Sequence, residues 1–262
     1  MKDETMRGSP DRIKADLDRF YERQSAEKTA DLEAWLGSGN PRVPQSRSYY
    51  YFEDRKIAAA LEMARPRPGA RILEIGCNLG QMTFPLAEMG FEMVGFDLSP
   101  SVIDKARLRA QRYGLKKISF EAKDGESYPD HADETFDAVF SFSTFRYFAD
   151  PLQGLREARR VLKRGGGAIV DFPNRLCPWF RILKPALRIK PHIHDHLFTA
   201  AAVRALMEEA GFDDVRVRTF LFFWKELPAA ALPLMKIGDA VFERIPGVRG
   251  LAGIIMAAGT KP

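Results

Sequence analysis

Short apolar runs alternate with stretches of helical spacing along the central part of the chain. The first run is "ARILEIGC", which starts at Ala70, and "EMVGFDLS", "ISFEAKD", "FDAVFSFST" and "GGAIVDF" follow it. Apolar runs of this length, bounded by turn residues, are typical of buried strands. Strands that alternate with helices of about 10–15 residues predict a parallel sheet with helices on both faces. Right-handed crossovers make such a sheet doubly wound.

The alternation changes after Phe172, where residues 173–198 form an irregular, proline-rich stretch. Thr199 is a good N-cap for the helix predicted from "AAAVRALMEEAG". Two more strands, "DDVRVRTFLFF" and "LAGIIMAAGT", bring the expected sheet to seven strands of an α/β fold. We predict a helical lid over residues 1–64 and a main domain over 65–262, with cap insertions at about 173–198 and 224–249.

Composition sets limits on what the protein does. With 262 residues and 45% hydrophobic content, the chain can form one large domain with caps. Cys77 and Cys177 lie far apart and outside any CxxC pair, which favours a reducing compartment. The charged N-terminus and the lack of a long apolar run predict a cytoplasmic protein. The net charge of +5 is spread too thinly to indicate a nucleic-acid partner.

The clearest local motif is "ILEIGCNLGQ", a strand that runs into a glycine turn and a helix. Gly76 and Gly80 allow a tight turn and the close approach of a ligand to the backbone. Asn78 stands between them, and asparagine tolerates a positive φ better than most residues. Because the G-x-G-x-x-G of dinucleotide binders is missing, the motif disfavours a dehydrogenase on a similar sheet.

Two aspartates follow the next two strands. Asp97 ends "VGFD", where a carboxylate can accept hydrogen bonds from ribose hydroxyls. Asp124 follows the third strand, where a carboxylate can accept from an amino group such as that of adenine. Either aspartate alone is compatible with a turn or helix cap. Together with the glycine turn, they indicate a ligand that contains a nucleoside.

The stretch from about 70 to 172 resembles the class I S-adenosylmethionine-dependent methyltransferases, close to the branch of ubiquinone-biosynthesis and related small-molecule enzymes. The resemblance rests on "LEIGCNLG", "GFDLSP", "KDGE", "FDAVFSFSTFRYFADP" and "EARRVLKRGGGAIV", with "FTAAAVRALMEEAGF" further along. It implies a Rossmann-like, mostly parallel sheet whose last strand is antiparallel and lies beside the fifth. It also implies S-adenosylmethionine as cofactor and S-adenosylhomocysteine as product. The cofactor-binding residues implied are Glu74, Gly76, Asn78, Gly80, Asp97, Leu98, Asp124, Gly125 and Ser141.

The reaction implied is in-line transfer of a methyl group to a small, largely apolar acceptor, with a hydroxyl favoured over carbon or nitrogen. The aromatic and proline-rich caps suggest a quinone, polyketide, lipid or sugar acceptor. A non-catalytic partner protein that kept only cofactor binding is the alternative from another class. The expected acceptor-binding residues are Tyr50, Tyr51, Arg146, Tyr147 and His192.

Three of the four histidines fall within "PHIHDHLFT". A metal site is not predicted, because the zinc-hydrolase pattern H-x-H-x-D-H lacks one residue here and further ligands are missing. A solvated turn before Thr199 and a catalytic base both fit the pattern. For the base, the candidates are His194 and His196, with Asp195 as orienting partner.

Basic and apolar residues are mixed in "CPWFRILKPALRIK", residues 177–190. Arg181, Lys184 and Arg188 follow helical spacing, and Pro185 restricts the segment to short helical pieces. The stretch is compatible with a lid, with weak contact to a membrane surface, or with binding of an anionic acceptor.

Overall fold

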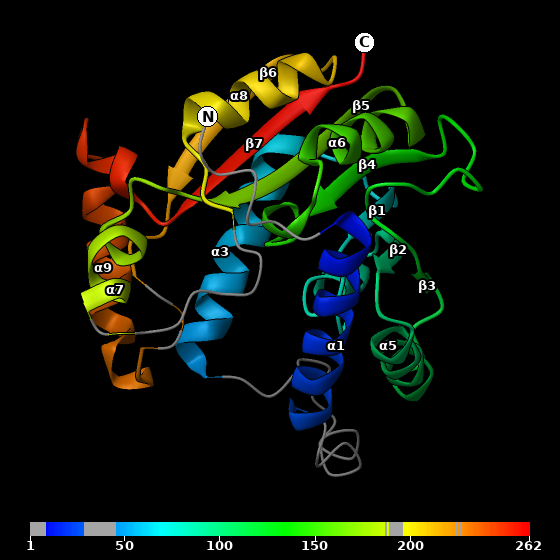
Figure 1. Ribbon diagram of the computed structural model, residues 1–262, viewed down its shortest axis with the longest axis horizontal. Helices are drawn as coiled ribbons and strands as arrows, with labels where there is room; N and C mark the ends of the chain where they lie inside the picture. The colour runs from blue at the N-terminus through cyan, green and yellow to red at the C-terminus, as the bar shows by residue number, and fades with distance from the viewer. Residues whose placement is uncertain (1–8, 29–45, 187, 189–195, 224, 226) are drawn as a thin grey trace.

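The computed structural model describes residues 9–28, 46–186, 188, 196–223, 225 and 227–262, and a seven-stranded sheet forms its centre (Figure 1). The strand order is β3-β2-β1-β4-β5-β7-β6. The strands are β1 (Arg71–Ile75), β2 (Glu92–Asp97), β3 (Ile118–Ala122), β4 (Phe136–Ser141), β5 (Leu162–Pro173), β6 (Asp213–Phe220) and β7 (Ile254–Thr260). β7 runs antiparallel between β5 and β6, and β1 to β5 are parallel. The predicted mostly parallel sheet with an antiparallel last strand is therefore confirmed.

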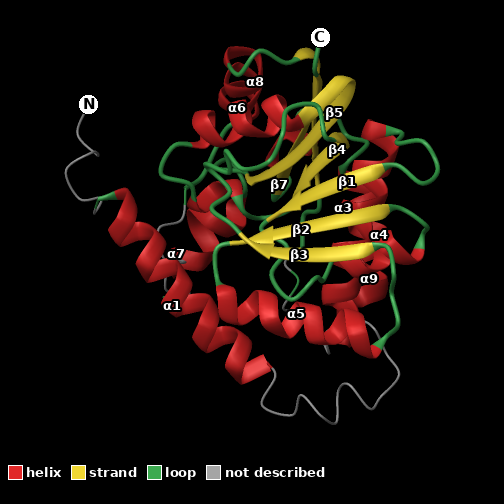
Figure 2. Cartoon of the chain, turned by 90° about the vertical axis from the view of Figure 1, so that its right-hand side faces the viewer, coloured by secondary structure: helices red, strands yellow, loops and turns green. Residues whose placement is uncertain are grey.

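Helices cover both faces of the sheet (Figure 2). The α-helices are α1 (Pro10–Lys28), α3 (Arg47–Ala64), α4 (Thr83–Glu88), α5 (Pro100–Arg112), α6 (Pro151–Val161), α7 (Lys184–Ala186), α8 (Ala200–Glu209) and α9 (Leu232–Phe242). Shorter helical turns are η1 (Phe145–Tyr147), η2 (Trp179–Leu183), η3 (Ala229–Ala231) and η4 (Val248–Leu251). Apolar side chains of α3, α4 and α5 pack on one face, and those of α6 and α8 pack on the other.

Burial on both faces explains why the central strands have no polar alternation. In β1, Leu73 and Ile75 pack toward α6 and α8, whereas Ile72 packs toward α3 and α4. All three side chains are at most 1% exposed. A parallel strand covered on both sides requires apolar residues at successive positions, which is the pattern in "ARILEIGC".

Local signals set most of the helix ends. The Thr199 side chain accepts a hydrogen bond from the Ala202 N–H, so the expected N-cap of α8 is confirmed. The helical pattern of "PLQGLREARRVLK" in the sequence extends to Lys163, whereas α6 ends at Val161. Leu162 instead begins β5 and pairs with Phe136 of β4, so tertiary pairing shortens the helix.

The N-terminal elements lie in different places. α1 lies beyond the arrowheads of β2 and β3 in Figure 2, and its Ile13 and Leu17 pack against Tyr147. α3 packs instead on the sheet, through residues such as Ile57 and Ala60. The division of the chain at residue 64 stays a prediction. Within residues 1–64, α1 covers the carboxyl ends of the strands.

Candidate functional site

A cavity of about 680 Å³ lies at the carboxyl ends of the parallel strands. β1 and β4 are neighbours there, with β2 on the other side of β1, so the cavity lies where the strand order reverses. Its walls come from the turns after β1 to β4, from α1 and α3, and from the segments after β5 and β6. Ligand sites in open α/β sheets occur at this position, and the volume is in the range of small-molecule sites.

The turn after β1 forms the floor of the cavity. The N–H groups of Gly76 and Cys77 both donate to the Phe96 carbonyl, at 2.7 and 2.8 Å. Gly76 has φ +78°, and a Cβ there would lie 2.0 Å from Thr144 Oγ1. Asn78 adopts φ 49°, as expected for the residue between the two glycines. Only glycine therefore fits at position 76, where the turn passes under the loop after β4.

Asp97 closes the next strand beside this turn. Its two carboxylate oxygens accept the N–H groups of Asn78 and Ser99, at 2.9 and 3.1 Å. Burial raises the pKa of this carboxyl, although these backbone hydrogen bonds oppose the shift. Each oxygen can still accept a second hydrogen bond from a ligand in the cavity.

A cation from α1 lies at the third strand end. Lys14 Nζ is 2.6 Å from Asp124 Oδ2 and 3.4 Å from Glu126 Oε2. Asp124 Oδ1 accepts the Glu126 N–H at 3.0 Å, which fixes the carboxylate. The helix over the cavity is thus tied by charge to the acidic residues that line it. We call Glu74, Asp97 and Asp124 the acidic end of the cavity.

Glu74 is the most deeply buried of these carboxyls, with 2% of its surface exposed. The Thr83 hydroxyl donates a hydrogen bond to Glu74 Oε2 at 2.5 Å, and Thr83 is the side-chain partner described for Glu74. Burial raises the pKa of Glu74 to about 8, with smaller contributions from the neighbouring carboxylates Asp97 and Glu53. A cationic ligand group beside Glu74 would favour its ionised form.

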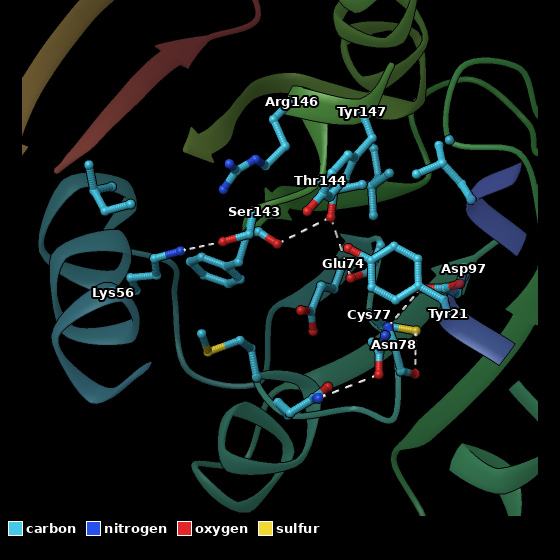
Figure 3. A pocket seen from close by; sticks show the side chains of 18 of the residues that line it. Tyr21, Lys56, Glu74, Cys77, Asn78, Asp97, Ser143, Thr144, Arg146 and Tyr147 are labelled. Atoms are coloured by element: carbon cyan, nitrogen blue, oxygen red, sulfur yellow. Dashed lines mark hydrogen bonds between the residues drawn. The ribbon is translucent and has the colours of Figure 1, made fainter. Parts of the chain in front are cut away.

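Lys56 of α3 lies across the cavity from Asp97 (Figure 3), and it forms a buried ion pair. Lys56 Nζ lies 2.7 Å from Asp171 Oδ2, and both side chains are 1% exposed. Lys56 also contacts Ser143 Oγ at 2.7 Å, and the Ser143 N–H donates to Asp171 Oδ1 at 2.7 Å. Burial lowers the pKa of Lys56, although Asp171 raises it. We call Lys56, Ser143 and Asp171 the buried triad.

Aromatic rings also line the cavity and come from α3, from the turn after β4 and from the segments after β5 and β6. They are Phe52, Phe142, Trp179, Phe180, Phe222 and Phe223, and we call them the aromatic end. The cavity therefore joins an acidic end to an aromatic end. Figure 3 shows Ser143 and Thr144 between Lys56 and Asp97.

The expected cofactor-binding residues come together in this cavity. Those that line it are Glu74, Gly76, Asn78, Asp97, Leu98, Asp124 and Gly125. The other two lie behind its wall. Gly80 packs against Phe84 in the turn, and Ser141 is fully buried with its hydroxyl donating to the Ile75 carbonyl.

The expected acceptor residues divide between the cavity and other surroundings. Arg146 and Tyr147 line the cavity. Tyr50 and Tyr51 are not among its lining residues, and the Tyr51 hydroxyl donates to Asp239 of α9 at 2.9 Å. From the same helix, Tyr49 and Phe52 line the cavity instead.

The histidine expectations have less structural support. His192 and His194 lie outside the described residues, as does Asp195. The His196 N–H donates to the Arg146 carbonyl at 3.0 Å, and His196 is not among the lining residues of the cavity. Within the described ranges, no cluster of three His, Cys, Asp or Glu side chains could hold a metal ion. Over the same ranges, every helix is too short or too polar to cross a membrane.

Sequence reasoning missed three charged residues that complete the site. Lys14 belongs to a helix interpreted only as a lid. Lys56 carried a readable signal, because a lysine stands at helical spacing among the apolar residues of "YYYFEDRKIAAALEMA". Asp171 carried another, as a charged residue inside the buried strand "GGAIVDF".

The residues present fit S-adenosylmethionine. Its ribose diol needs an acceptor pair such as Asp97, and its adenine amino group needs an acceptor such as Asp124. Its positive charges suit the acidic end, where the buried Glu74 has no cationic partner among the described ion pairs. Gly76 lets the backbone approach the ligand closely, because the turn leaves no room for a side chain there.

Comparisons with known proteins agree with this geometry. Residues 66–211 match a family model described as a methyltransferase domain. A ubiquinone biosynthesis O-methyltransferase of Ruegeria sp. (strain TM1040) is 31% identical over 175 residues, which are 63% of this chain and 70% of the relative. A protein of the same description from Cereibacter sphaeroides (strain ATCC 17029) is 37% identical over 122 residues, which are 47% of each chain. The chain thus spans between about half and somewhat more than two thirds of these relatives.

A solved structure also matches over nearly the whole chain. It is a methyltransferase from Thermotoga maritima, described as S-adenosylmethionine-dependent and as a possible histamine N-methyltransferase. The TM-score is 0.62 at 20% identity, over 94% of this chain and 99% of the other. At this identity the match establishes the fold.

Proposed function

This chain belongs to the class I S-adenosylmethionine-dependent methyltransferases, and we propose that it methylates a hydroxyl group of a small, largely apolar acceptor. One observation carries the proposal: a single cavity joins the acidic end to the aromatic end, with the polar turn Ser143–Thr144 between them. The relatives named above are described as O-methyltransferases of ubiquinone biosynthesis, which favours an acceptor of the quinone type with a ring hydroxyl.

The acidic end would hold the cofactor. Asp97 would accept from the ribose and Asp124 from the adenine, while Glu74 and the Gly76 turn would hold the methionine part. When bound, the cofactor supplies a methyl group on a positively charged sulfur, so methylation of a hydroxyl leaves a neutral thioether and releases one proton.

The protein contributes alignment and exclusion of water. α1 covers the carboxyl ends of the strands through Ile13 and Leu17, and the Lys14–Asp124 ion pair holds it there. The aromatic end offers flat apolar walls to a ring-shaped acceptor. Holding two reactants in line accounts for about 7–11 kcal/mol of a barrier in favourable cases. A positioned proton acceptor contributes about 10²–10⁴-fold in rate.

Cofactor binding is tested first, by calorimetric titration with S-adenosylhomocysteine. We expect micromolar binding by the wild type and at least a tenfold loss in Asp97→Ala. Asp104→Ala is the matched control, because it removes the same charge from an exposed site on α5, where the described ion pairs join Asp104 to Arg107 of the same helix. If a folded wild type fails to bind, the proposed function is wrong.

The acceptor class is tested next, with S-adenosylmethionine and a panel of alkylated catechols and quinols, anilines and activated-carbon compounds. Product mass and formation of S-adenosylhomocysteine are measured for each compound. Methylation confined to nitrogen or carbon would replace the hydroxyl assignment. Binding without turnover of any compound would favour a non-catalytic role.

A further inference from the structure

The roles proposed for the cofactor-binding residues do not involve the buried triad, yet it stands in the wall of the reaction cavity. Lys56 comes from α3, Ser143 follows β4, and Asp171 lies near the end of β5. Ser143 is half-buried and lines the cavity, whereas Lys56 and Asp171 are almost fully covered. The serine hydroxyl is thus the part of the triad best placed to meet a ligand.

Stability does not account for this arrangement. Removing two charges from water costs several kcal/mol per ion, and apolar residues of similar volume often stabilise a protein as well as a buried pair does. Ser143 also adopts φ 59°, a left-handed conformation that is uncommon for residues other than glycine. Strained backbone of this kind concentrates at functional sites.

The triad stands next to the place where transfer must occur. Thr144, the residue after Ser143, lies against the Gly76 turn, with its hydroxyl 3.5 Å from the Gly76 carbonyl. On the other side of Ser143, Lys56 lies near the Phe52 ring, with its nitrogen 5.0 Å from the ring centre. Ser143 therefore lies between the Gly76 turn at the acidic end and Phe52 at the aromatic end, and Figure 3 shows it between Lys56 and Thr144.

We propose that Ser143 accepts the proton of the acceptor hydroxyl and passes its own proton to the amine form of Lys56. The carboxylate of Asp171 balances the positive charge that Lys56 then carries. The proposal deepens the proposed function and rests on it, because only a hydroxyl acceptor must lose a proton in this way.

The proton balance is complete within the triad. The acceptor O–H bond breaks as a new O–H bond forms on Ser143 Oγ, and the original Ser143 O–H bond breaks as an N–H bond forms on the Lys56 amine. The freed electron pair of the acceptor oxygen forms the bond to the methyl group, and the pair of the broken S–CH₃ bond stays on sulfur. The Lys56 ammonium group then loses one proton to solvent before the next turnover.

The surroundings of Lys56 favour this exchange. In the ammonium form, Lys56 donates to Ser143 Oγ, and in the amine form its nitrogen can accept across the same 2.7 Å. Burial lowers the pKa of Lys56, and the positive charges of Arg146 and Lys225 lower it further, while Asp171 opposes them. Glu53, one turn earlier on α3, is the other charged side chain of that helix in the cavity wall.

The test compares two ring-hydroxylated probes of different acidity. 4-Methylcatechol is a weak acid, whereas 4-nitrocatechol ionises near neutral pH and its ionised form absorbs visible light. Ser143→Gly removes the hydroxyl and suits the left-handed backbone, and Lys56→Met removes the amine. We expect each variant to lose about 10²–10⁴-fold in kcat on 4-methylcatechol but less than about tenfold on 4-nitrocatechol.

A second measurement needs no turnover. The visible spectrum of 4-nitrocatechol bound together with S-adenosylhomocysteine reports how much of the probe is ionised. We expect a larger ionised fraction on the wild type than on Ser143→Gly or Lys56→Met at the same pH. A merely structural role would leave the spectrum of the bound probe unchanged.

Arg55→Met is the matched control, because it removes the neighbouring ion-paired cation of α3. Arg55 pairs with Glu243 at 2.7 Å and does not line the cavity. If Lys56→Met does not fold, Ser143→Gly decides the test. Equal losses on both probes with an unchanged bound spectrum would overturn the relay. A wild type that methylates no hydroxyl acceptor would overturn the proposed function, and the relay with it.

Discussion

Two glycines with similar backbone angles, Gly69 and Gly76, allow the cost of backbone strain to be distinguished from the cost of steric overlap, because each can be replaced by alanine. Gly69 and Gly76 have φ +73° and +78°, both left-handed. A Cβ at Gly69 meets nothing within 4 Å, whereas at Gly76 it lies 2.0 Å from Thr144 Oγ1 and 2.6 Å from Thr144 Cβ. Alanine at either site pays for the left-handed backbone, about 1–2 kcal/mol. Only Gly76→Ala also forces the loop after β4 to move.

Overpacking of this kind costs about 1–3 kcal/mol, so we expect Gly76→Ala to lose about 2–5 kcal/mol of unfolding free energy in total. Gly69→Ala should lose only the cost of the left-handed backbone, about 1–2 kcal/mol. Urea unfolding at equal m-values measures both losses. Calorimetry with S-adenosylhomocysteine should show weaker binding by Gly76→Ala and unchanged binding by Gly69→Ala. Equal losses of stability in the two variants would refute the steric argument.

Three further changes test charges and caps. The pKa of Glu74, about 8 in the folded protein against an ordinary 4.5, means that its contribution to stability is present below pH 4.5 and is lost as the pH rises through 8. Unfolding measured across that range should show a weaker pH dependence in Glu74→Gln, and an unchanged dependence would contradict the assignment. Lys14→Met removes the ion pair that holds α1 over the cavity, so calorimetry should show S-adenosylhomocysteine binding up to about fivefold weaker, equivalent to about 1 kcal/mol, whereas tighter binding would mean that Lys14 competes with the ligand for Asp124. Thr199→Ala removes the cap of α8 and should cost about 1 kcal/mol in urea unfolding, with Thr199→Ser, which keeps the capping hydroxyl, as the control.

The sheet could be predicted from the sequence because its signals are local. Each central strand is an apolar run that ends in a turn, and both faces are buried, so every residue of the run is constrained. The positions of the glycine turn, Asp97 and Asp124 at the cavity could be predicted for the same reason, since each lies at the end of a strand or within two residues after it. The place of β7 between β5 and β6 has no local signal, and it came from the family resemblance.

The aromatic run at the start of α3 shows that helical periodicity sorts neighbouring residues onto different faces of a helix. Tyr49, Phe52 and Lys56 stand at i, i+3 and i+7, on one helical face, and all three line the cavity. Tyr51 and Arg55, at i and i+4, lie on another face and bond to α9. A helical projection places Tyr49 and Phe52 on the face that lines the cavity, whereas Tyr50 and Tyr51, the predicted acceptor contacts, are not among its lining residues.

The pairings of the site depend on topology, and no local pattern contains them. Lys14 and Asp124 are 110 positions apart, and Lys56 and Ser143 are 87 apart. Such pairs form because parallel strands bring their carboxyl ends to one edge of the sheet, where α1 and α3 can reach several strand ends at once. A histidine cluster is conspicuous in sequence because its members are adjacent, whereas a triad assembled from three elements is not. We therefore seek the group that manages the proton among the buried charges of the cavity wall, where adjacency in the sequence gives no signal.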